Sequence, residues 1–387
     1  MLKVETTVQI DVVQGAIDQA AGYLINNLQK NGMFRYRINT NSGVKLRPKY
    51  NILHHAGCVY ALSLYNQYCP SENVRRAVKT SANYLSKEAV QPIPGSQTTL
   101  AVWARPEMHN TTRPLQAGLD GAGTGLLAFL SLHTIQKEVV SIEYLQALGR
   151  FIVYMQQGDK SFYARYIPLF GGKKRPQSLK HYPMEATLGL LMLHEKDRYS
   201  IWLETACVAL ESLVRHGKPA SMADINPWTL LAISKLLSFN SKVGMPMPKE
   251  LLVAYATRVC ELLLRQQIDT PRQPHYSGGF SKDGVTLPTA AWIEGLLAAL
   301  TFLPVNTRLT KQIHCAVRRG INFLLQAQIR DGEWAGAIPR AVGPLRSRRA
   351  AAIAFNQRAT EVRIDYVQYA MRAWMKYVSL APVLSMS

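Results

Sequence analysis

The stretch LINNLQKNGMFRY (24–36) recurs in altered form three times along the chain. In each copy a long amphipathic run leads into Gln, then into Gly or another turn residue, and then into an aromatic residue. The other copies are FIVYMQQGDKSFY (151–163), LLLRQQIDT (262–270) continuing to YSGGF (276–280), and FLLQAQIRDGEW (323–334). A unit reused at intervals predicts a fold built from repeated helical pairs.

Apolar periodicity fills the rest of the chain with helices of two kinds. Amphipathic helices with charged outer faces are expected at 8–30, 71–90, 141–157, 198–217, 248–268 and 309–329. Helices richer in Ala, Gly, Leu and Met are expected between them, at 52–68, 118–136, 181–196, 223–239, 286–303 and 364–380. Helices with so little polar surface are buried on most sides. Six outer helices therefore alternate with six inner ones.

The connections differ in length in a regular way. Links from an inner to an outer helix are short, whereas four links in the opposite direction are long: 31–51, 91–117, 158–180 and 330–363. Long loops should therefore gather at the end where the inner helices begin, and functional residues are often carried by such loops. We expect short β-hairpin-like loops on that face.

Charge is concentrated in the same four links. They contain 20 Lys and Arg against 5 Asp and Glu, in a chain of net charge +20. The N-termini of the inner helices, which carry partial positive charge, would point the same way. An anionic partner is therefore expected, whether an acidic saccharide, a phosphorylated or carboxylated small molecule, a membrane surface or nucleic acid.

Composition narrows the class of protein. Apolar residues make up 48% of the 387 residues and charged residues 18%, which is enough for a large core. Five cysteines without a CxxC pair are typical of reduced core thiols. We expect one domain over 1–387, without a signal peptide or transmembrane segment, in the cytoplasm.

The alternation of helices with Gln–Gly–aromatic punctuation resembles the α/α-toroid superfamily. Its members include six-hairpin glycosidases, polysaccharide lyases, sugar epimerases, terpene cyclases, prenyltransferases and lanthionine cyclases. The resemblance implies an all-α (α/α)6 toroid of six helical hairpins. The strings YNILHHAG (50–57), HYPMEA (181–186), IEGLLAAL (293–300) and RIDYVQ (363–368) also resemble poorly characterised bacterial toroid proteins.

Some branches of that superfamily fit poorly. The acidic DxDD run of one terpene cyclase class is absent from the sequence. Cys58 lies beside His54 and His55 but lacks the other spaced ligands of a zinc site. The run GAGTG (121–125) opens an inner helix without a preceding strand, so no nucleotide fingerprint is present. We predict no cofactor and no metal, although the sequence leaves open whether a divalent cation assists.

Polar residues at the starts of the expected inner helices are the candidates for chemistry. Glu185 and Glu294 lie about a turn inside apolar helices, where an unpartnered carboxylate would be costly. Asp224 and Asp365 have structural alternatives, a helix cap and an ion pair with Arg363 respectively. The predicted catalytic set is Glu185, Glu294, Asp224, Asp365, His54 and Tyr182.

The predicted substrate-binding set combines aromatic, polar and basic side chains near the same helix starts. Its members are His55, Asp120, Trp228, Trp292, Gln368, Arg35, Arg47, Lys174, Arg175 and Arg363. At most one of His54 and His55 should face the pocket, because adjacent helical residues point about 100° apart. Asp120 is equally compatible with a capping role.

Three functions remain open at this level. The first is a carbohydrate-active hydrolase of glycosidase type, acting on an anionic saccharide in a basic central pocket through two carboxyl groups. The second is a uronate lyase or epimerase, with Tyr182 or a histidine removing a proton. The third is a non-catalytic polyanion-binding or scaffold protein. Nucleic acid is possible as a partner but is not favoured, because no nucleic-acid-binding module is legible.

Overall fold

The structure is a computed structural model, and it describes residues 8–41, 43–46, 49–106, 113–174, 183–217, 219–239, 247–269 and 274–384. Arg47, Arg175 and Tyr182 lie outside these residues. The chain forms two compact units. The first unit comprises Met1–Asn27, Arg37–Leu46 and Cys260–Ser387, and the second comprises Leu28–Tyr36 and Arg47–Val259. Both consist mainly of helices, with a few short strands.

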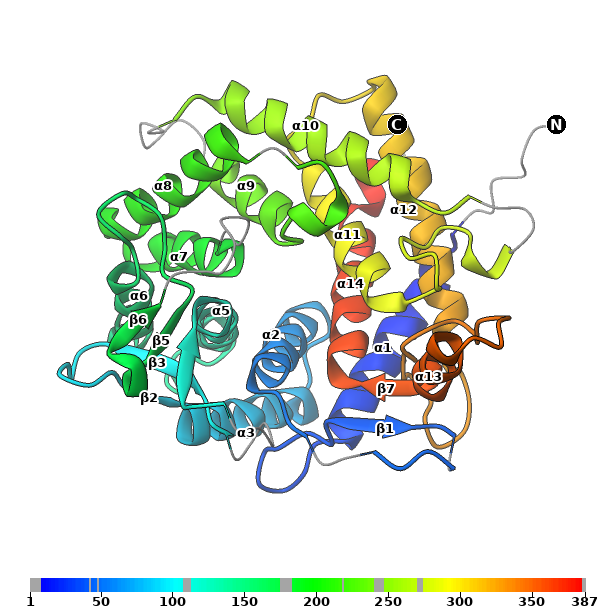
Figure 1. Cartoon of the computed structure of the whole chain (residues 1–387), viewed down its shortest axis with the longest axis horizontal. Coiled ribbons are helices and arrows are strands. Elements are labelled where there is room, and N and C mark those ends of the chain that lie inside the picture. The colour runs from blue at the N-terminus through cyan, green and yellow to red at the C-terminus, as the bar shows by residue number, and fades with distance from the viewer. Residues whose placement is uncertain are drawn as a thin grey trace. The chain divides into compact units, whose positions relative to one another are not determined.

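Helices of the second unit alternate between two layers (Figure 1). In one layer each helix packs against the next one along the series α2 (Ile52–Tyr68), α5 (Leu119–Ile135), α7 (Met184–Asp197) and α9 (Thr229–Ser238). The other layer contains α3 (Glu72–Ala89), α6 (Ile142–Tyr154) and α8 (Ser200–His216), which pack against the first. These two layers correspond to the inner and outer helices expected from the sequence.

The glycines of α5 allow its close packing. A Cβ atom at Gly123 would lie 2.7 Å from the Cα of Ala186, at the start of α7. At Gly125 it would lie 2.6 Å from Cγ2 of Val102. A Cβ at Gly121 would touch Leu53, beside the start of α2, at 3.1 Å. The run GAGTG therefore brings the beginnings of three helices together.

Two of the long links, 91–117 and 158–180, form a five-stranded antiparallel sheet. Its strands, in spatial order, are β2 (Val90–Pro92), β3 (Leu100–Ala104), β4 (Gln116–Gly118), β5 (Arg165–Ile167) and β6 (Gly172–Lys174). Strand β4 runs directly into α5, so the sheet lies at the end of the unit where α5 begins. The expectation of hairpin-like loops is confirmed.

In the first unit, α14 (Ile364–Leu384) packs against both α1 (Ile10–Asn26) and α11 (Thr286–Ala299). Helix α12 (Arg308–Ala327) packs on α11 and α14. Strand β7 (Glu361–Arg363) leads into α14 and pairs antiparallel with β1 (Arg37–Asn39).

Four further elements belong to the described secondary structure. They are α10 (Lys249–Gln266), the two short 3-10 helices η1 (Pro168–Phe170) and η3 (Pro274–Tyr276), and α13 (Ala350–Ala359). Helix α13 lies inside the segment 330–363, for which the sequence predicted a long link and no helix.

The expected helices agree closely with the structure, and α2 has the predicted bounds 52–68. The largest difference is the helix expected at 223–239, which begins at Thr229 after a short 3-10 turn, η2 (Met222–Asp224). Pro227 explains the difference, because its ring disfavours helical geometry at the preceding residue, Asn226. No helix among the described residues is long and apolar enough to cross a membrane.

Candidate active site

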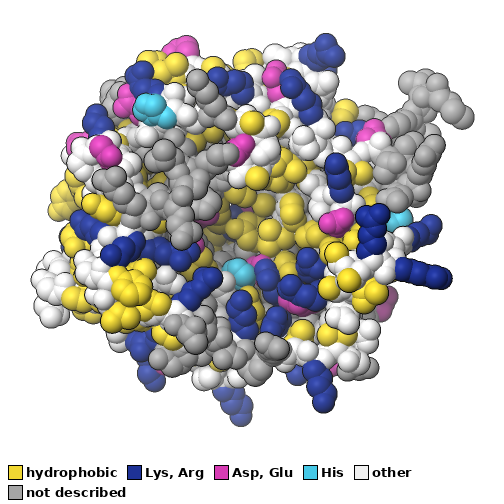
Figure 2. All heavy atoms as spheres, in the orientation of Figure 1, with side chains coloured by type: hydrophobic (Ala, Val, Ile, Leu, Met, Phe, Trp, Pro, Cys, Tyr) yellow, Lys and Arg dark blue, Asp and Glu magenta, His cyan; other side chains and the backbone are white. Residues whose placement is uncertain are grey.

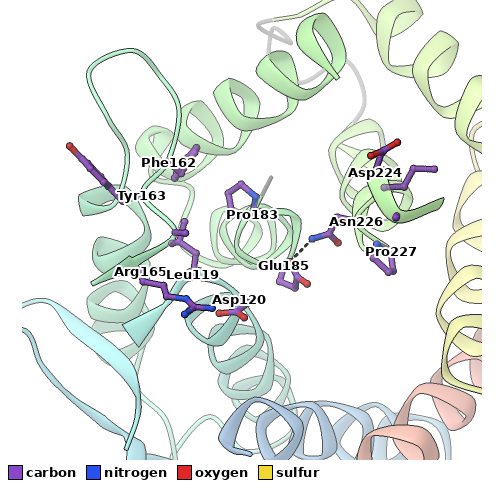
Figure 3. A pocket seen from close by; sticks show the side chains of 13 residues that line it. Leu119, Asp120, Phe162, Tyr163, Arg165, Pro183, Glu185, Asp224, Asn226 and Pro227 are labelled. Atoms are coloured by element: carbon purple, nitrogen blue, oxygen red, sulfur yellow. Dashed lines mark hydrogen bonds between the residues drawn. The ribbon is translucent and has the colours of Figure 1, made fainter. Parts of the chain in front are cut away.

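A pocket of about 320 Å³ lies within the second unit (Figure 3). It is lined by the first residues of α5 and α7, by the segment 223–227 that precedes α9, and by the segment 162–165 that enters β5. The pocket therefore lies where inner helices begin, as expected for functional residues in this chain. Its volume is at the lower end of the range typical of small-molecule sites.

Glu185 is a carboxylate of the pocket that a residue from another segment holds in place. It lies in the first turn of α7 and is half-buried. Asn226 donates from Nδ2 to Glu185 Oε2 at 2.9 Å, and its own Oδ1 accepts from the backbone N–H of Trp228 at 2.9 Å. Because the backbone group can only donate, it fixes which way the Asn226 amide faces. Asn226 therefore orients the carboxyl group of Glu185 within the pocket (Figure 3).

Asp120 lies in the first turn of the neighbouring helix, α5, and is exposed. Its Oδ1 accepts from the backbone N–H of Gly121 at 2.8 Å. Gly118 is the N-cap residue of α5 and has no side chain, so this bond from Asp120 satisfies a backbone N–H of the first turn, in line with the capping alternative. Arg165 comes from β5 and points toward Asp120 (Figure 3). The pocket thus contains a second carboxylate beside a guanidinium group.

Asp224 also lines the pocket, but its hydrogen bonds hold the local turn together. Its Oδ2 accepts from the backbone N–H groups of Ala220 and Ser221, at 3.1 and 3.0 Å, and from the Ser221 hydroxyl at 3.1 Å. Together with Ser221 it forms a capping box over η2. This arrangement matches the capping alternative considered for Asp224.

The described lining is more acidic than the basic pocket that the sequence led us to expect. It contains the carboxylates of Asp120, Glu185 and Asp224 against the single guanidinium of Arg165. Other basic side chains lie beside the pocket, and Figure 2 shows Lys and Arg gathered over β5 and β6. Lys173 Nζ lies 3.7 Å from the Tyr154 ring centroid. Lys174 Nζ, a predicted binding group, lies 5.9 Å from that of Phe170.

The two adjacent histidines have different environments. His54 is half-buried at the start of α2, and its Nδ1 forms a hydrogen bond of 3.0 Å with the Tyr36 hydroxyl. His55 is fully buried, with Nδ1 2.6 Å from the Tyr50 hydroxyl and Nε2 2.8 Å from the Ser81 carbonyl oxygen. Both its ring nitrogens are thus held by the protein, and neither histidine lines the described pocket.

The other predicted residues of the second unit lie apart from the pocket lining. Trp228 is buried, and its ring centroid lies 6.3 Å from that of Tyr60. Arg35 is exposed in the turn before β1.

In the first unit, predicted site residues form ion pairs whose carboxylates are buried. Arg372 donates from Nε to Glu294 Oε1 at 3.0 Å and from Nη2 to Oε2, and it also contacts Gln368. Arg363 binds Asp365 in the same bidentate way, with Nε 2.9 Å from Oδ1. Trp292 is 6% exposed. The structure therefore brings Glu294 and Gln368 together around Arg372 and supports the ion-pair alternative for Asp365.

Three residues that the predicted set lacks are important in this geometry. Asn226 positions Glu185, Arg165 faces Asp120, and Arg372 neutralises Glu294. Arg372 had a readable signal, because a cation inside the apolar run YAMRAW is as costly to bury as a carboxylate. Asn226 and Arg165 had no such signal in the sequence, because their importance depends on contacts between segments that are distant in the chain.

Solved structures with low sequence identity share this fold over nearly the whole chain. A D-mannose isomerase gives a TM-score of 0.67 at 10% identity, covering 98% of this chain and 99% of that one. The cellobiose 2-epimerase of Spirochaeta thermophila gives 0.65 at 13%, covering 96% of each chain. A possible member of the GH105 family from Salmonella enterica serovar Paratyphi A gives 0.61 at 12%, covering 98% and 97%.

These similarities show that the chain has the α/α-toroid fold, as its sequence resemblance implied. No family model and no curated protein sequence matches the chain. The structural neighbours are glycosidase-, epimerase- and isomerase-type carbohydrate enzymes.

Proposed function

We propose that this α/α toroid is a carbohydrate-active enzyme that binds a saccharide in the pocket of the second unit. The observation that carries the proposal is Glu185, a half-buried carboxyl group that Asn226 holds in place at the start of α7. The reaction is acid–base catalysis of glycosidase type, with Glu185 transferring a proton at the glycosidic oxygen.

Asp120 supplies the second carboxyl group that this chemistry needs. It lies on the adjacent helix and borders the same pocket. One carboxylic acid protonates the leaving oxygen, while a second carboxylate activates water or attacks the sugar. Asp224 is less suited to either role, because one of its oxygens accepts three hydrogen bonds from its own turn.

The substrate we propose is an acidic saccharide whose anionic group is bound by Arg165, although the described lining holds three carboxyl groups against this one cation. Arg165 is the cation that lines the pocket, and Lys173 and Lys174 lie on the neighbouring strand. An Arg side chain binds a carboxylate or sulfate through two parallel hydrogen bonds. An unsaturated glucuronyl hydrolase specific for heparin, with a TM-score of 0.62 at 10% identity, has the same fold and acts on a sugar of this kind.

A sugar epimerase or isomerase is the second candidate. The observation that favours it is His54, which lies half-buried at the start of α2 with Tyr36 on its Nδ1. A histidine can remove a proton next to a sugar carbonyl, but His54 does not line the described pocket, so the sugar would have to extend beyond that lining. Deuterium incorporated from heavy water into the recovered sugar, without release of new reducing ends, would identify this reaction instead.

The test is a turnover screen of the purified chain on acidic and neutral oligosaccharides, followed by variants. Glu185→Gln should lower kcat about 10²–10⁴-fold, because it removes the proton donor and keeps the side-chain shape. Asn226→Ala should lower kcat less, since it loosens the carboxyl group without removing it.

Glu195→Gln is the matched control for Glu185→Gln. Glu195 is exposed on the same helix and pairs with Lys235 at 2.7 Å, far along the helix from the pocket end. It should keep wild-type activity. Equal activity of wild type and Glu185→Gln would exclude Glu185 as the catalytic acid. Turnover of no sugar, together with salt-sensitive binding of unrelated polyanions, would favour the scaffold function.

A further inference from the structure

A second pocket, of about 280 Å³, lies entirely within the first unit. Two segments form it. One is the turn from η3 to the start of α11, which contributes His275, Tyr276 and Lys282. The other is the segment 344–347 between α12 and α13. The pocket belongs to neither the Glu185 site nor the ion pairs described above.

The charge of this pocket is uniformly positive. Lys282 and Arg346 supply two cations, and His275 and Ser347 add polar groups, whereas none of the described lining residues is a carboxylate. Asp283 follows Lys282 in the chain but is not a lining residue. Among the residues that the structure describes, neither Lys282 nor Arg346 forms an ion pair. No ion pair among the described residues therefore compensates the charge of this lining.

The backbone around these cations is held in place by hydrogen bonds. The Leu345 N–H donates to Asn356 Oδ1 at 2.7 Å, and Asn356 Nδ2 donates to the Leu345 carbonyl at 3.0 Å. The Val342 N–H donates to the Gly284 carbonyl at 3.1 Å. Helix α13 and the turn before α11 thus fix the segment that carries Arg346. The side chains of Lys282 and Arg346 are exposed, so the backbone that carries them is ordered beforehand and the side chains still lose entropy when a ligand arrives.

Tyr276 forms a rigid part of the wall. Its side chain is 5% exposed, and its ring packs against Gly284, which adopts a φ of 66°. A Cβ atom at Gly284 would lie 2.7 Å from Cε1 of that ring, so glycine is needed here for both reasons. Lys282 is carried by the same turn, and its backbone position is therefore set by this packing.

We infer that this pocket binds a phosphate or sulfate group carried by a small molecule. Arg346 can bind such an oxyanion through its guanidinium fork, and Lys282 can contribute a point charge. Pro344 and Leu345 offer an apolar wall to the remainder of the ligand. The volume is slightly below the range of about 300–1,000 Å³ for pockets that hold drug-sized ligands, so a compact ligand such as a sugar phosphate is favoured over a polymer.

The experiment is isothermal titration of the full chain at low salt with inorganic phosphate, sulfate, glucose 6-phosphate and glucose. We expect binding either of phosphate and glucose 6-phosphate or of sulfate. Glucose, which carries no oxyanion, should not bind. Lys282→Gln and Arg346→Gln should each weaken binding about tenfold or more, because each removes a charged hydrogen-bond donor. The relative affinities for phosphate and sulfate identify which oxyanion the pocket prefers.

Two matched variants separate a pocket from a generally basic surface. Arg348→Gln removes an equal charge from an exposed residue that does not line the pocket, and it should change binding less than about twofold. Ser347→Trp narrows the pocket with no change of charge and should abolish binding. Circular dichroism checks that each variant is folded.

Three results would overturn the inference. They are an absence of binding of phosphate and sulfate by the wild-type chain, equal losses in Arg348→Gln and Arg346→Gln, and undiminished binding by Ser347→Trp. Preferential, steeply salt-dependent binding of duplex DNA would mean that the charge serves a polymer surface instead. Sugar turnover plays no part in this test, so its outcome is independent of the proposed function.

Discussion

Glu294 of α11 and Arg372 of α14 form an ion pair between two helices whose other side chains are mostly apolar. Glu294 is 4% exposed and Arg372 is 1% exposed. Lys376 lies near them, and burial holds its pKa below the usual value while the neighbouring Glu294 opposes that shift. Two cations thus face one carboxylate in this part of the first unit. Removing the carboxylate alone would leave buried positive charge without compensation.

We therefore expect Glu294→Gln to lower the free energy of unfolding by about 3–5 kcal/mol, measured by urea denaturation. The double variant Glu294→Leu/Arg372→Met should be more stable than Glu294→Gln, because apolar side chains of similar volume leave no buried charge from this pair. If the double variant proved the less stable of the two, the pair would contribute net stability beyond mutual neutralisation.

His55 shows how the surrounding groups set the protonation state of a residue. The Ser81 carbonyl can only accept, so Nε2 of His55 carries the proton and Nδ1 accepts from the Tyr50 hydroxyl. The Tyr50 oxygen in turn accepts from the Phe34 N–H at 3.1 Å. This chain of bonds ties the turn after α1 to α2 and α3, and it requires the neutral imidazole. Burial lowers the pKa of His55 from 6.5 to about 4.

A pH dependence of stability follows from that shift. Between pH 6.5 and about 4 the unfolded chain binds a proton at His55 that the folded chain does not, so stability falls as the pH decreases through this window. The loss approaches about 3 kcal/mol. His55→Gln can form similar hydrogen bonds without titrating, so its stability should change less over this window. His216→Gln, at an exposed histidine, should keep the wild-type slope. Parallel slopes for wild type and His55→Gln would refute the assignment.

At the scale of elements, the recurring Gln and Gly attach two of the repeated turns, those after α10 and α12, to a neighbouring helix. Gln267, after α10, donates to the Ala316 carbonyl of α12 at 2.8 Å, and Gln328, after α12, donates to the Ala16 carbonyl of α1 at 2.8 Å. Gly278 and Gly336 have positive φ, and a Cβ atom at either would overlap backbone atoms of those same helices. The repeat in the sequence therefore encodes helix-to-helix spacing, which is why it predicted the helical order.

Gly123 likewise allows close packing of two helices, α5 and α7, and a substitution there tests this spacing. Gly123→Ala should destabilise the protein by about 1–3 kcal/mol, because the added methyl group would overlap the backbone at Glu185 and Ala186. It should also lower any activity that depends on Glu185. Thermal unfolding and turnover are the measurements.

The control is Gly15→Ala, in the exposed part of α1, where a Cβ atom would meet nothing within 4 Å. Its helix should gain about 0.5–1 kcal/mol from the reduced flexibility of the unfolded chain. Equal effects of the two substitutions would mean that α5 and α7 can move apart freely.

Across the whole molecule, the fold was far more predictable than the site. Periodicity and the Gln–Gly repeat located the expected helices, because both signals are local in sequence. Pairing is not local: the Asn226–Glu185 and Arg372–Glu294 bonds join residues 41 and 78 positions apart. The sequence identified Glu185 and Glu294 alike as carboxylates inside apolar helices. Only the tertiary contacts separate the carboxyl group that lines a pocket from the one that is neutralised in the interior.

The chain carries a net charge of +20. Like charges in a compact state repel one another, and at 0.01 M salt that repulsion extends over about 30 Å, compared with about 8 Å at 0.15 M. We therefore expect the Tm to rise when sodium chloride is increased over this range. The double variant Arg348→Gln/Arg349→Gln, which removes two exposed charges from one segment, should show a smaller rise. A Tm that falls with added salt would mean that attractive pairs such as Arg358–Glu361, at 2.9 Å, outweigh the repulsion.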